Sequence, residues 1–421
     1  MRKHVLMVMF ALITMVKCDY VYAFSAVAPS GQTLYYNIVG GNAQVASHKG
    51  SALMTGALVI PSSVEYNGTT YAVTSIVDYA FWHCIYLTSV TIPSTVTTIG
   101  NFVFDYCWDM KSMSVESGNT VYDSRENCNA IIKTETNTLL YGCKNTVIPN
   151  TVTTIGTRAF YSHTGLTSIN IPNSVTIIMP SAFSGCTGLT SVTIPSSVAR
   201  IGSSAFCSCS SLRLVNYTGT SAQWCGIDFG TEDANPLYYS HNLSINGFPV
   251  TDMVIPDGVT VIKRYAFFRC SGLSSVTIPN TVTSIGSLAF QGTGLRLIEC
   301  FAMVPPTIGN PNTFNATNVP IYVPCGKEAD YRAASYWNSF TNIQEVCGTA
   351  GATGVSVYAE GNDIVVEGAA GYTVTLNDNG GNELEVSVAS MGEHLRFEGL
   401  TSGTYFVKIG VLPARMKVVV E

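Results

Sequence analysis

Three consecutive blocks of 23 residues align without gaps in the middle of the chain: VIPNTVTTIGTRAFYSHTGLTSI (147–169), NIPNSVTIIMPSAFSGCTGLTSV (170–192) and TIPSSVARIGSSAFCSCSSLRLV (193–215). Each block carries a proline near its start and a phenylalanine 11 residues after it. Self-similarity at one short period is the signature of stacked-repeat architectures. No block of this size can bury its own apolar face, so the blocks predict a solenoid whose units share one long core.

Four further copies extend the array on both sides. Two follow at 254–276 and 277–298, and two precede it with their prolines at Pro61 and Pro93. In six of the seven copies the phenylalanine stands 11 residues after the proline, whereas the segment EYNGTTYAV (65–73) adds nine residues to the first copy. The array is therefore expected to cover residues 57–298.

Within one unit, the segment LTSVTI (189–194) has the period of a half-buried strand. Val192 and Ile194 alternate with Ser191 and Thr193, so one set is expected to face the core and the other to face outward. Pro195 ends the strand because it has no N–H to donate. The Ala-Phe pair that follows predicts a short helical or 3₁₀ corner with its phenylalanine in the core. The fold class is therefore mainly β.

The repeat consensus is I-P-x-x-V-x-x-I-G-x-x-A-F-x-x-C-x-x-L-x-x-V. It resembles the BspA-type leucine-rich repeat of bacterial surface proteins over about residues 57–346. The resemblance implies a leucine-rich-repeat solenoid, a secreted or cell-surface location, and adhesion to host matrix proteins or to other cells.

The remaining segments suggest inserts, caps and a second domain. Two inserts, at 114–146 and 216–253, lengthen the spacing between repeats. In the first, apolar pairs flank the polar turn 134–138 and predict a β-hairpin. We expect 24–56 to form an N-terminal β cap and 299–346 to close the other end of the solenoid. A Gly-rich linker (347–354) then leads to a small all-β sandwich (355–421).

The end of the sandwich carries LTSGTYFVKIG (400–410) and KVVV (417–420). These motifs resemble the C-terminal sorting domain of type IX secretion cargo. The alternative is a plain β-sandwich accessory module.

The N-terminus reads as a signal peptide. The basic residues Arg2 and Lys3 precede the apolar run VLMVMFALITMV (5–16), which at 12 residues is too short to span a bilayer. The small residues around Ala23 predict cleavage after it, giving an exported protein. Lipidation at Cys18 is the alternative, and no later segment is long and apolar enough to be a transmembrane helix.

Composition excludes several classes of function. The net charge is −6, and charged residues make up 11% of the chain, so nucleic acid is an unsuitable partner. The chain lacks H-E-x-x-H and G-x-S-x-G motifs, phosphate-binding glycine loops and clustered metal ligands. We therefore expect no enzyme activity, no cofactor and no metal.

Outward positions of the repeat strands are candidate binding residues. In leucine-rich repeats such positions line the concave sheet, and here they are Ser168, Asn170, Ser191, Thr193, Ser275 and Thr277. A hydroxyl-rich, nearly uncharged surface can bind polar partners through many neutral hydrogen bonds. The alternative is that these hydroxyls only solvate an exposed sheet.

The insert at 216–253 is rich in aromatic residues. Its candidate binding residues are Tyr217, Trp224, Tyr238 and Tyr239, because inserts in repeat proteins often carry binding. The alternative is a self-packed loop whose aromatics form its own small core.

The cysteines predict one disulfide at most in each insert or cap. Cys84, Cys107, Cys186, Cys209 and Cys270 all stand three residues after the repeat phenylalanine, which indicates a buried structural position. Cys128 and Cys143 are equidistant from the hairpin turn, so a disulfide between them is possible in an exported protein. Pairing of Cys325 with Cys347 is a second possibility.

These observations together predict a secreted or cell-surface adhesin or binding protein. Its partner would be a host extracellular-matrix protein, a glycan or another cell surface, recognised through the solenoid without catalysis. A structural protein that self-associates and a glycan-capture protein are the alternatives.

Overall fold

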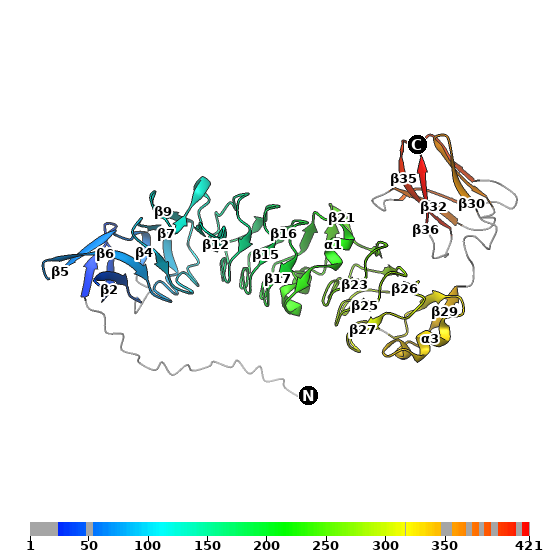
Figure 1. The fold of residues 1–421 in the computed structure, drawn as a ribbon, viewed down its shortest axis with the longest axis horizontal. Helices are drawn as coiled ribbons and strands as arrows, with labels where there is room; N and C mark the ends of the chain where they lie inside the picture. The colour runs from blue at the N-terminus through cyan, green and yellow to red at the C-terminus, as the bar shows by residue number, and fades with distance from the viewer. Residues whose placement is uncertain are drawn as a thin grey trace, which may run out of the picture. The chain divides into compact units, whose positions relative to one another are not determined.

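The structure is a computed structural model, and it describes residues 24–47, 54–315, 317–346, 356–367, 373–378, 383–388, 395–409 and 415–420. The predicted signal peptide (1–23) and linker (347–354) lie outside these residues. The chain divides into two compact units, Met1–Val147 and Ile148–Glu421. Both consist mainly of β-strands, as predicted, and Figure 1 labels several of them.

The first unit begins with a small sheet. The strands β1 (Phe24–Val27), β2 (Thr33–Val39) and β3 (Asn42–Val45) form an antiparallel meander, and β3 pairs in parallel with β6 (Thr69–Ile76). Tyr36 on β2 is fully buried and belongs to the same core as Phe81 of the first repeat. Such a cap keeps the open end of stacked repeats out of water.

The nine residues that lengthen the first repeat form a hairpin. Strand β5 (Ser63–Tyr66) pairs antiparallel with β6, and the turn between them is Asn67-Gly68, with φ of 50° and 75°. Asn-Gly suits a two-residue hairpin turn, because both positions need positive φ. Strand β6 then pairs in parallel with β8 (Thr98–Ile99), so the insertion leaves the repeat register intact.

A second ladder of the first unit consists of β4 (Thr55–Val59), β7 (Tyr86–Ile92) and β9 (Ser112–Val115), all parallel. The insert at 114–146 adds β10 (Tyr122–Asp123), β11 (Ile131–Lys133) and β12 (Thr138–Tyr141). Strands β11 and β12 are antiparallel, which confirms the predicted hairpin.

The second unit stacks its coils through two ladders of parallel strands. The longer strands, which carry the LTSVTI segments, are β14 (Ser168–Asn170), β16 (Ser191–Ile194), β18 (Leu214–Tyr217) and β20 (Leu243–Ile245); β21 (Phe248–Pro249) pairs antiparallel with β20. The shorter strands are β13 (Thr154–Ile155), β15 (Ile177–Ile178), β17 (Arg200–Ile201) and β19 (Asp228–Phe229). Ser168 lies opposite Ser191, which is the 23-residue period seen as strand register.

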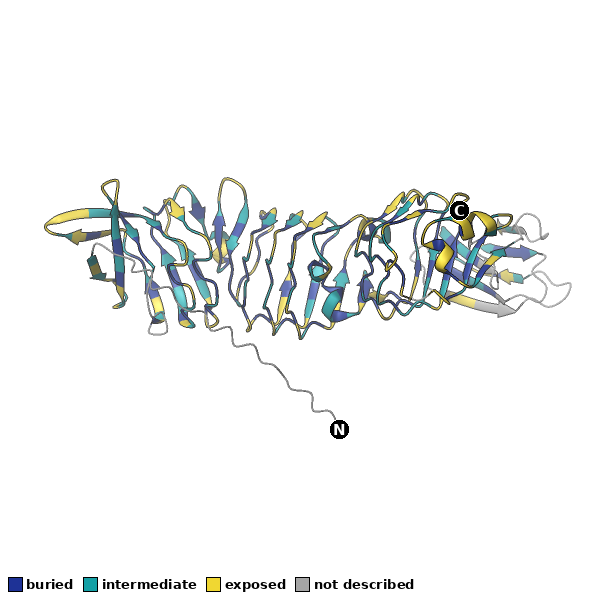
Figure 2. Cartoon of the chain, turned by 90° about the horizontal axis from the view of Figure 1, so that it is seen from below, coloured by how far each residue is buried: buried dark blue, intermediate teal, exposed yellow. Residues whose placement is uncertain are grey.

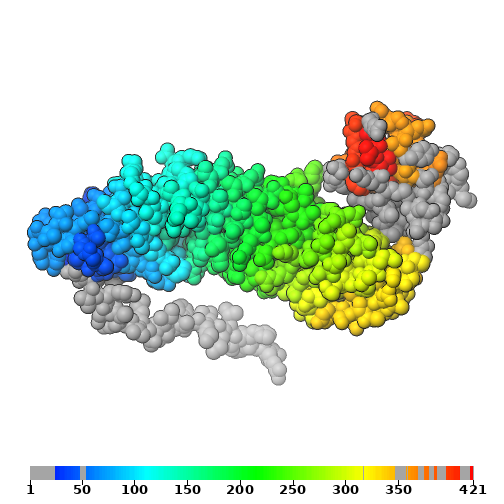
Figure 3. Space-filling model, viewed as in Figure 1, coloured from blue at the N-terminus to red at the C-terminus, as the bar shows by residue number. Residues whose placement is uncertain are grey.

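The pairing resumes after residue 250 in the same pattern. The longer strands are β22 (Asp252–Val254), β24 (Ser275–Ile278), β26 (Leu297–Cys300), β28 (Ile321–Pro324) and β29 (Ile343–Val346), and the shorter ones are β23 (Val261–Ile262), β25 (Ser284–Ile285) and β27 (Thr307–Ile308). Helix α3 (Glu328–Ala333) and the 3₁₀ turn η4 (Trp337–Ser339) lie between the last two strands. Successive coils form neighbouring bands of colour in the space-filling view (Figure 3).

The segment 216–253, which we expected to interrupt the array, carries a coil of its own. Strand β20 continues the ladder of longer strands beside β18, and β19 continues the ladder of shorter strands beside β17. The extra length forms α1 (Ser221–Cys225), η3 (Glu232–Ala234) and α2 (Leu237–Ser240). The coil formed by 216–253 therefore stacks in register with its neighbours, although its sequence does not match the repeat consensus.

The corner that carries each Ala-Phe pair is a run of tight turns rather than the short helical or 3₁₀ segment we expected. Arg158 and Ser162 flank Phe160 with φ of 57° and 59°, and a left-handed residue ends a right-handed helix. The N–H of Phe160 donates to the carbonyl of Ala182 in the next coil at 2.8 Å. The corners thus form a third hydrogen-bonded ladder between coils.

The repeat phenylalanines stack on one another in the core. Ring centroids are 5.1 Å apart between Phe160 and Phe183 and 5.2 Å apart between Phe183 and Phe206, with the planes within 13° of parallel. Phe314 extends a second such column, 5.2 Å from Phe290. Figure 2 shows the alternation of buried and more exposed residues along the strands that surround this core.

The C-terminal part consists of two antiparallel sheets. One contains β30 (Ser356–Glu360), β31 (Asp363–Glu367) and β34 (Leu395–Phe397), and the other contains β33 (Glu383–Val388), β32 (Thr373–Asp378), β35 (Gly403–Ile409) and β36 (Arg415–Val420). Their shared core includes Ile364, Leu376, Phe397 and Val407. The hydroxyl of Tyr405 donates to the carbonyl of Thr401 at 2.7 Å, as tyrosine corners of β-sandwiches do.

Candidate functional site

Four of the predicted binding residues lie together on two neighbouring strands. Ser168 lies opposite Ser191, and Asn170 lies opposite Thr193, on the outward side of β14 and β16. We call these four residues the polar row. Their side chains make no hydrogen bond within the part of the chain that the structure describes, so their donors and acceptors are available to a partner.

The other two predicted residues, Ser275 and Thr277, are already engaged. The Ser275 hydroxyl donates to the carboxylate of Asp252 on the neighbouring strand. The Thr277 hydroxyl donates to Oε2 of Glu299 at 2.6 Å, and Glu299 is only 7% exposed. Here the outward hydroxyls satisfy carboxylates of the fold, which makes β22, β24 and β26 a weaker binding surface than the polar row.

Many other hydroxyls of the array have a structural role. In the position two residues after the repeat proline, Thr95 donates to the carbonyl of Val73 at 2.7 Å, and Ser197 donates to that of Val175 at 2.7 Å. These bonds tie one coil to the one before it. Serine and threonine are abundant in this chain partly because the coils need such links.

The prediction that Tyr217 and Trp224 bind a partner is wrong, since both side chains are fully buried. Their rings pack edge to face at 5.1 Å, and Nε1 of Trp224 donates to the carbonyl of Ala266 at 2.8 Å. They fill the core of the long coil, because its extra residues carry helices that need apolar packing beneath them.

Tyr238 and Tyr239 are partly buried, and both make contacts with other residues of the protein. The guanidinium of Arg269 lies 4.2 Å from the centre of the Tyr238 ring, within cation–π range. The Tyr239 hydroxyl accepts a hydrogen bond from the N–H of Ser208 at 2.8 Å. The self-packed alternative therefore describes this segment better than the binding hypothesis.

The recurring cysteines are buried thiols that link coils. Sγ of Cys186 donates to the carbonyl of Phe160 at 3.0 Å, and Sγ of Cys209 donates to that of Phe183 at 3.2 Å. Burial raises the pKa of the Cys209 thiol to about 12. A nucleophilic cysteine needs a thiolate at neutral pH, so this position is suited to packing and not to chemistry.

Cys128 and Cys143 are free thiols, contrary to the disulfide that we considered. Both are buried, and their Sγ atoms donate to the carbonyls of Ala130 (3.7 Å) and Asn129 (3.3 Å). Cys325 is disulfide-bonded, and Cys347, its possible partner, lies outside the described residues.

A β-bulge breaks the hairpin symmetry from which the disulfide between these two cysteines was predicted. Ile132 pairs with Leu139, as the symmetric register predicts, but the next pair is Ile131 with Tyr141. A bulge leaves one extra residue on one strand. Since side chains alternate between the faces of a sheet, that one-residue shift ends the symmetry on which the predicted pairing depended.

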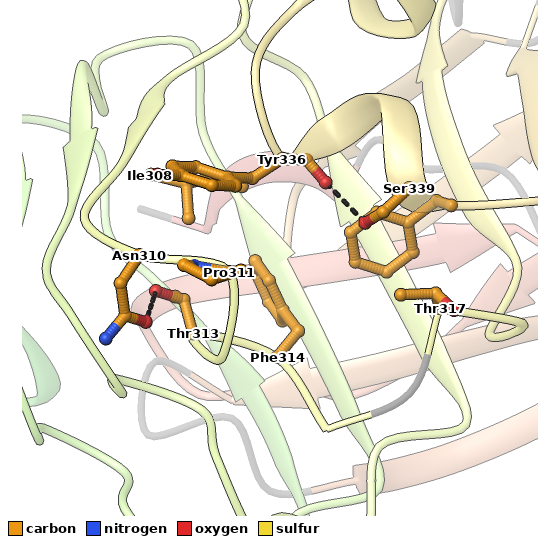
Figure 4. A pocket seen from close by; sticks show the side chains of 9 residues that line it. Ile308, Asn310, Pro311, Thr313, Phe314, Thr317, Tyr336 and Ser339 are labelled. Atoms are coloured by element: carbon orange, nitrogen blue, oxygen red, sulfur yellow. Dashed lines mark hydrogen bonds between the residues drawn. The ribbon is translucent and has the colours of Figure 1, made fainter.

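Two hollows among the described residues are candidate ligand sites. A cavity of about 10 Å³ lies beside Phe314 and Phe340, with a hydrogen bond from the Ser339 hydroxyl to the carbonyl of Tyr336 at its edge (Figure 4). It holds no more than about one water. An open hollow of about 390 Å³ in the first unit is lined by 115–119 and 122–127, where Arg125 is paired with Asp123 at 2.6 Å.

The lining of the open hollow includes carboxylates and serine hydroxyls, and its Asp123 carboxylate is held by Arg125. Among the described residues there is no group of three His, Cys, Asp or Glu placed to hold a metal ion. No helix in the same part of the chain is long and apolar enough to cross a membrane.

The first unit carries a group of exposed and partly exposed aromatic residues that the sequence patterns did not reveal. We call Trp82, His83, Tyr106 and Trp108 the aromatic cluster. Ring centroids are 5.8 Å apart both between Trp82 and Tyr106 and between His83 and Trp108, with each pair edge to face. Trp82 is 43% exposed and Trp108 is 39% exposed.

The repeat alignment contained a signal for this cluster. His83 and Tyr106 both stand two residues after the repeat phenylalanine, where the coils of the second unit have Ser162, Gly185, Ser208, Arg269 and Gly292. The period places such residues on adjacent coils at the same corner. A comparison of the residues at the outward-facing repeat positions, and not only at the core positions, would have revealed the aromatic cluster.

Comparison with known proteins agrees with the repeat architecture. The pattern of the BspA type leucine rich repeat region matches residues 62–139, 132–223 and 244–319, in six copies. Together these residues make up more than half of the chain. No curated protein matches it.

Solved structures of other leucine-rich-repeat proteins resemble the chain. A leucine rich cell surface protein from Faecalibacterium prausnitzii is 22% identical, with 78% of this chain and 96% of that chain covered at a TM-score of 0.38. A leucine-rich repeat protein from Bacteroides ovatus is 20% identical, with 77% and 100% covered at 0.38. The pneumococcal vaccine antigen PcpA is 13% identical, with 75% and 97% covered at 0.33.

The seven repeats, the 23-residue strand register and the extent of the matched pattern lead to the same assignment. The chain belongs to the BspA-type leucine-rich-repeat family.

Proposed function

We propose that the protein is an exported, surface-located binding protein that attaches to a host extracellular-matrix protein or glycan through outward side chains of its solenoid, without catalysis. The observation that carries this function is the polar row, whose hydrogen-bonding groups are not used by the fold. Each neutral hydrogen bond contributes about 1 kcal/mol net, so affinity would come from many such contacts along the array. The apolar segment 5–16 supports export.

The polar row can be tested by charge insertion. In the variant S191D/T193D, two carboxylates lie side by side on β16, and we expect adhesion to immobilised matrix proteins and glycans to fall about tenfold. The control is T187D/A199D, which adds the same charge at exposed positions of the same coil outside the row. Unchanged adhesion of S191D/T193D would remove the polar row from the function. Concentration-dependent filaments in analytical ultracentrifugation, without adhesion, would favour a self-associating surface protein instead.

In the same proposal, residues 355–421 act as a sorting domain for type IX secretion. The motif around Gly403 and Tyr405 supports this role by resemblance, although Tyr405 also has a purely structural bond to Thr401. Deletion of 355–421 should leave the protein in the periplasm. Normal surface display of the truncated chain would refute the sorting role and leave the accessory-module alternative.

A further inference from the structure

Three features of the aromatic cluster separate it from the rest of the array. The first is its exposed tryptophans. The chain has four, and Trp224 and Trp337 are fully buried, whereas Trp82 and Trp108 are each about two-fifths exposed. Large exposed apolar groups gathered on one surface mark interaction sites in soluble proteins.

The second feature is that the fold does not need aromatic residues at these positions. At the position of Trp108, the coils of the second unit have Thr164, Thr187, Ser210 and Ser271. At the position of His83 and Tyr106, which both have φ of 64°, two of those coils have glycine. Side chains other than glycine are disfavoured in this left-handed region. His83, Tyr106 and Trp108 are thus placed where most coils of the second unit have small residues. At the position of Trp82 two of those coils also have an aromatic residue, Tyr161 and Phe268.

The third feature is the charge of the surrounding turns. Residues 78–111 contain two exposed carboxylates, Asp78 and Asp109, and one exposed base, Lys111. Asp105 lies in the same segment but is buried. The Asp109 carboxylate, next to Trp108 in the chain, is exposed and makes no hydrogen bond among the described residues. The exposed charge is therefore negative on balance, which disfavours a phosphate, sulfate or sialic acid group.

We infer that the aromatic cluster is a binding site for neutral oligosaccharides. This inference rests on the proposed function and names one class of ligand and one place for it. The face of an aromatic ring carries partial negative charge, and the C–H groups on one side of a pyranose ring carry partial positive charge. A sugar ring therefore stacks on an exposed indole, while its hydroxyls donate to acceptors at the edge.

The geometry fits a short oligosaccharide better than a single sugar. Trp82 and Trp108 belong to adjacent coils and both have exposed surface, with His83 between them at 5.3 Å and 5.8 Å from the two rings. Two stacking surfaces can hold two sugar units. Asp109 supplies an acceptor beside the second ring, and a carboxylate accepts hydrogen bonds from two neighbouring hydroxyls.

The experiment is a titration of the full chain with neutral hexasaccharides of glucose, mannose and galactose, with sialyllactose and a heparin hexasaccharide as anionic probes. Intrinsic fluorescence reports the wild type, because its two accessible tryptophans are those of the cluster; calorimetry compares the variants. We expect at least one neutral sugar to bind and W82A/W108A to bind it about tenfold more weakly or not at all. The conservative variant W82F/W108F, which keeps two rings, should retain most of the affinity. F248A removes an exposed ring of the second unit and is the matched control.

Each other outcome overturns the inference. The inference is wrong if none of the neutral sugars binds or if the anionic probes bind more tightly than they do. It is also wrong if W82A/W108A binds the sugar with unchanged affinity. If W82A/W108A loses adhesion to a deglycosylated matrix protein while no sugar binds, the cluster is a protein-docking surface. In that case the proposed function stands and the sugar assignment fails. Circular dichroism of each variant verifies that the fold is intact.

Discussion

Nε1 of Trp224 donates a 2.8 Å hydrogen bond to the carbonyl of Ala266, 42 residues along the chain. This bond joins the long coil, which lacks the repeat consensus, to the first regular coil that follows it. The indole is fully buried and packs edge to face against Tyr217 and Phe229. Trp224 thus joins the long coil to the next coil by a side-chain hydrogen bond, whereas the repeat phenylalanines join coils by stacking of their rings.

Replacing Trp224 should therefore destabilise the second unit strongly. We expect W224A to lower the free energy of unfolding by about 3–5 kcal/mol, because it leaves a large cavity. W224F should lower it by about 1–3 kcal/mol, since the ring is largely kept and the hydrogen bond is lost. Urea unfolding followed by circular dichroism measures both. Equal stability of W224A and wild type would contradict the buried position.

The phenylalanine column makes a second prediction. Phe183 stacks on a ring at each side, so F183A should lower the free energy of unfolding by about 3–5 kcal/mol through cavity formation and lost stacking. F248A is the control, because Phe248 is 56% exposed and should change stability by less than about 0.5 kcal/mol. Thermal melts of the two variants, measured side by side, give the comparison.

The buried thiols predict a loss of stability in alkaline solution. Burial raises the pKa of Cys209 and Cys225 to about 12 and that of Cys300 to about 11, from 9.0 in the absence of burial. Above about pH 9 the unfolded chain loses thiol protons that the folded chain keeps, so unfolding becomes more favourable as pH rises towards these values. Below pH 9 the thiols are protonated in both states and contribute no pH dependence.

The measurement is the melting temperature between pH 7 and 11. We expect the thiols to leave the melting temperature unchanged up to about pH 9 and to lower it at higher pH. The variant C209A/C225A should fall less steeply than wild type over the same range. Identical slopes would show that these two thiols do not titrate differently in the two states.

Tyr405 gives a prediction for the C-terminal sandwich. Y405F removes the hydroxyl that donates to the Thr401 carbonyl at 2.7 Å and keeps the buried ring. We expect a loss of about 0.5–1.5 kcal/mol in the stability of this domain. Differential scanning calorimetry of the full chain should show a lower transition for the sandwich, with the transitions of the solenoid unchanged.

The period made the array predictable, because a repeat of fixed length determines which residues stack. Ser168 lies opposite Ser191 for the same reason that Phe160 lies over Phe183. The aromatic residues of 216–253 could not be assigned in this way. Composition does not reveal whether Tyr217 faces the core or the solvent when its coil has lost the consensus.

The repeat pattern also could not predict irregularities that involve a single residue. The bulge between Ile131 and Ile132 shifts the pairing partner of Ile131 by one residue. No residue type in the hairpin sequence predicts this bulge. The difference between Ser191 and Ser275 is of the same kind. The two occupy one repeat position, and only the neighbour, Asp252, decides that the second hydroxyl is engaged.

The three ladders between coils have a mechanical consequence. Hydrogen bonds that join one coil to the next point along the stacking direction, so a pull in that direction strains them lengthwise, and coils detach in succession from an end. Each detached coil of 23 residues frees up to about 80 Å of chain. Under tension such an array therefore lengthens in steps of one coil rather than in a single event.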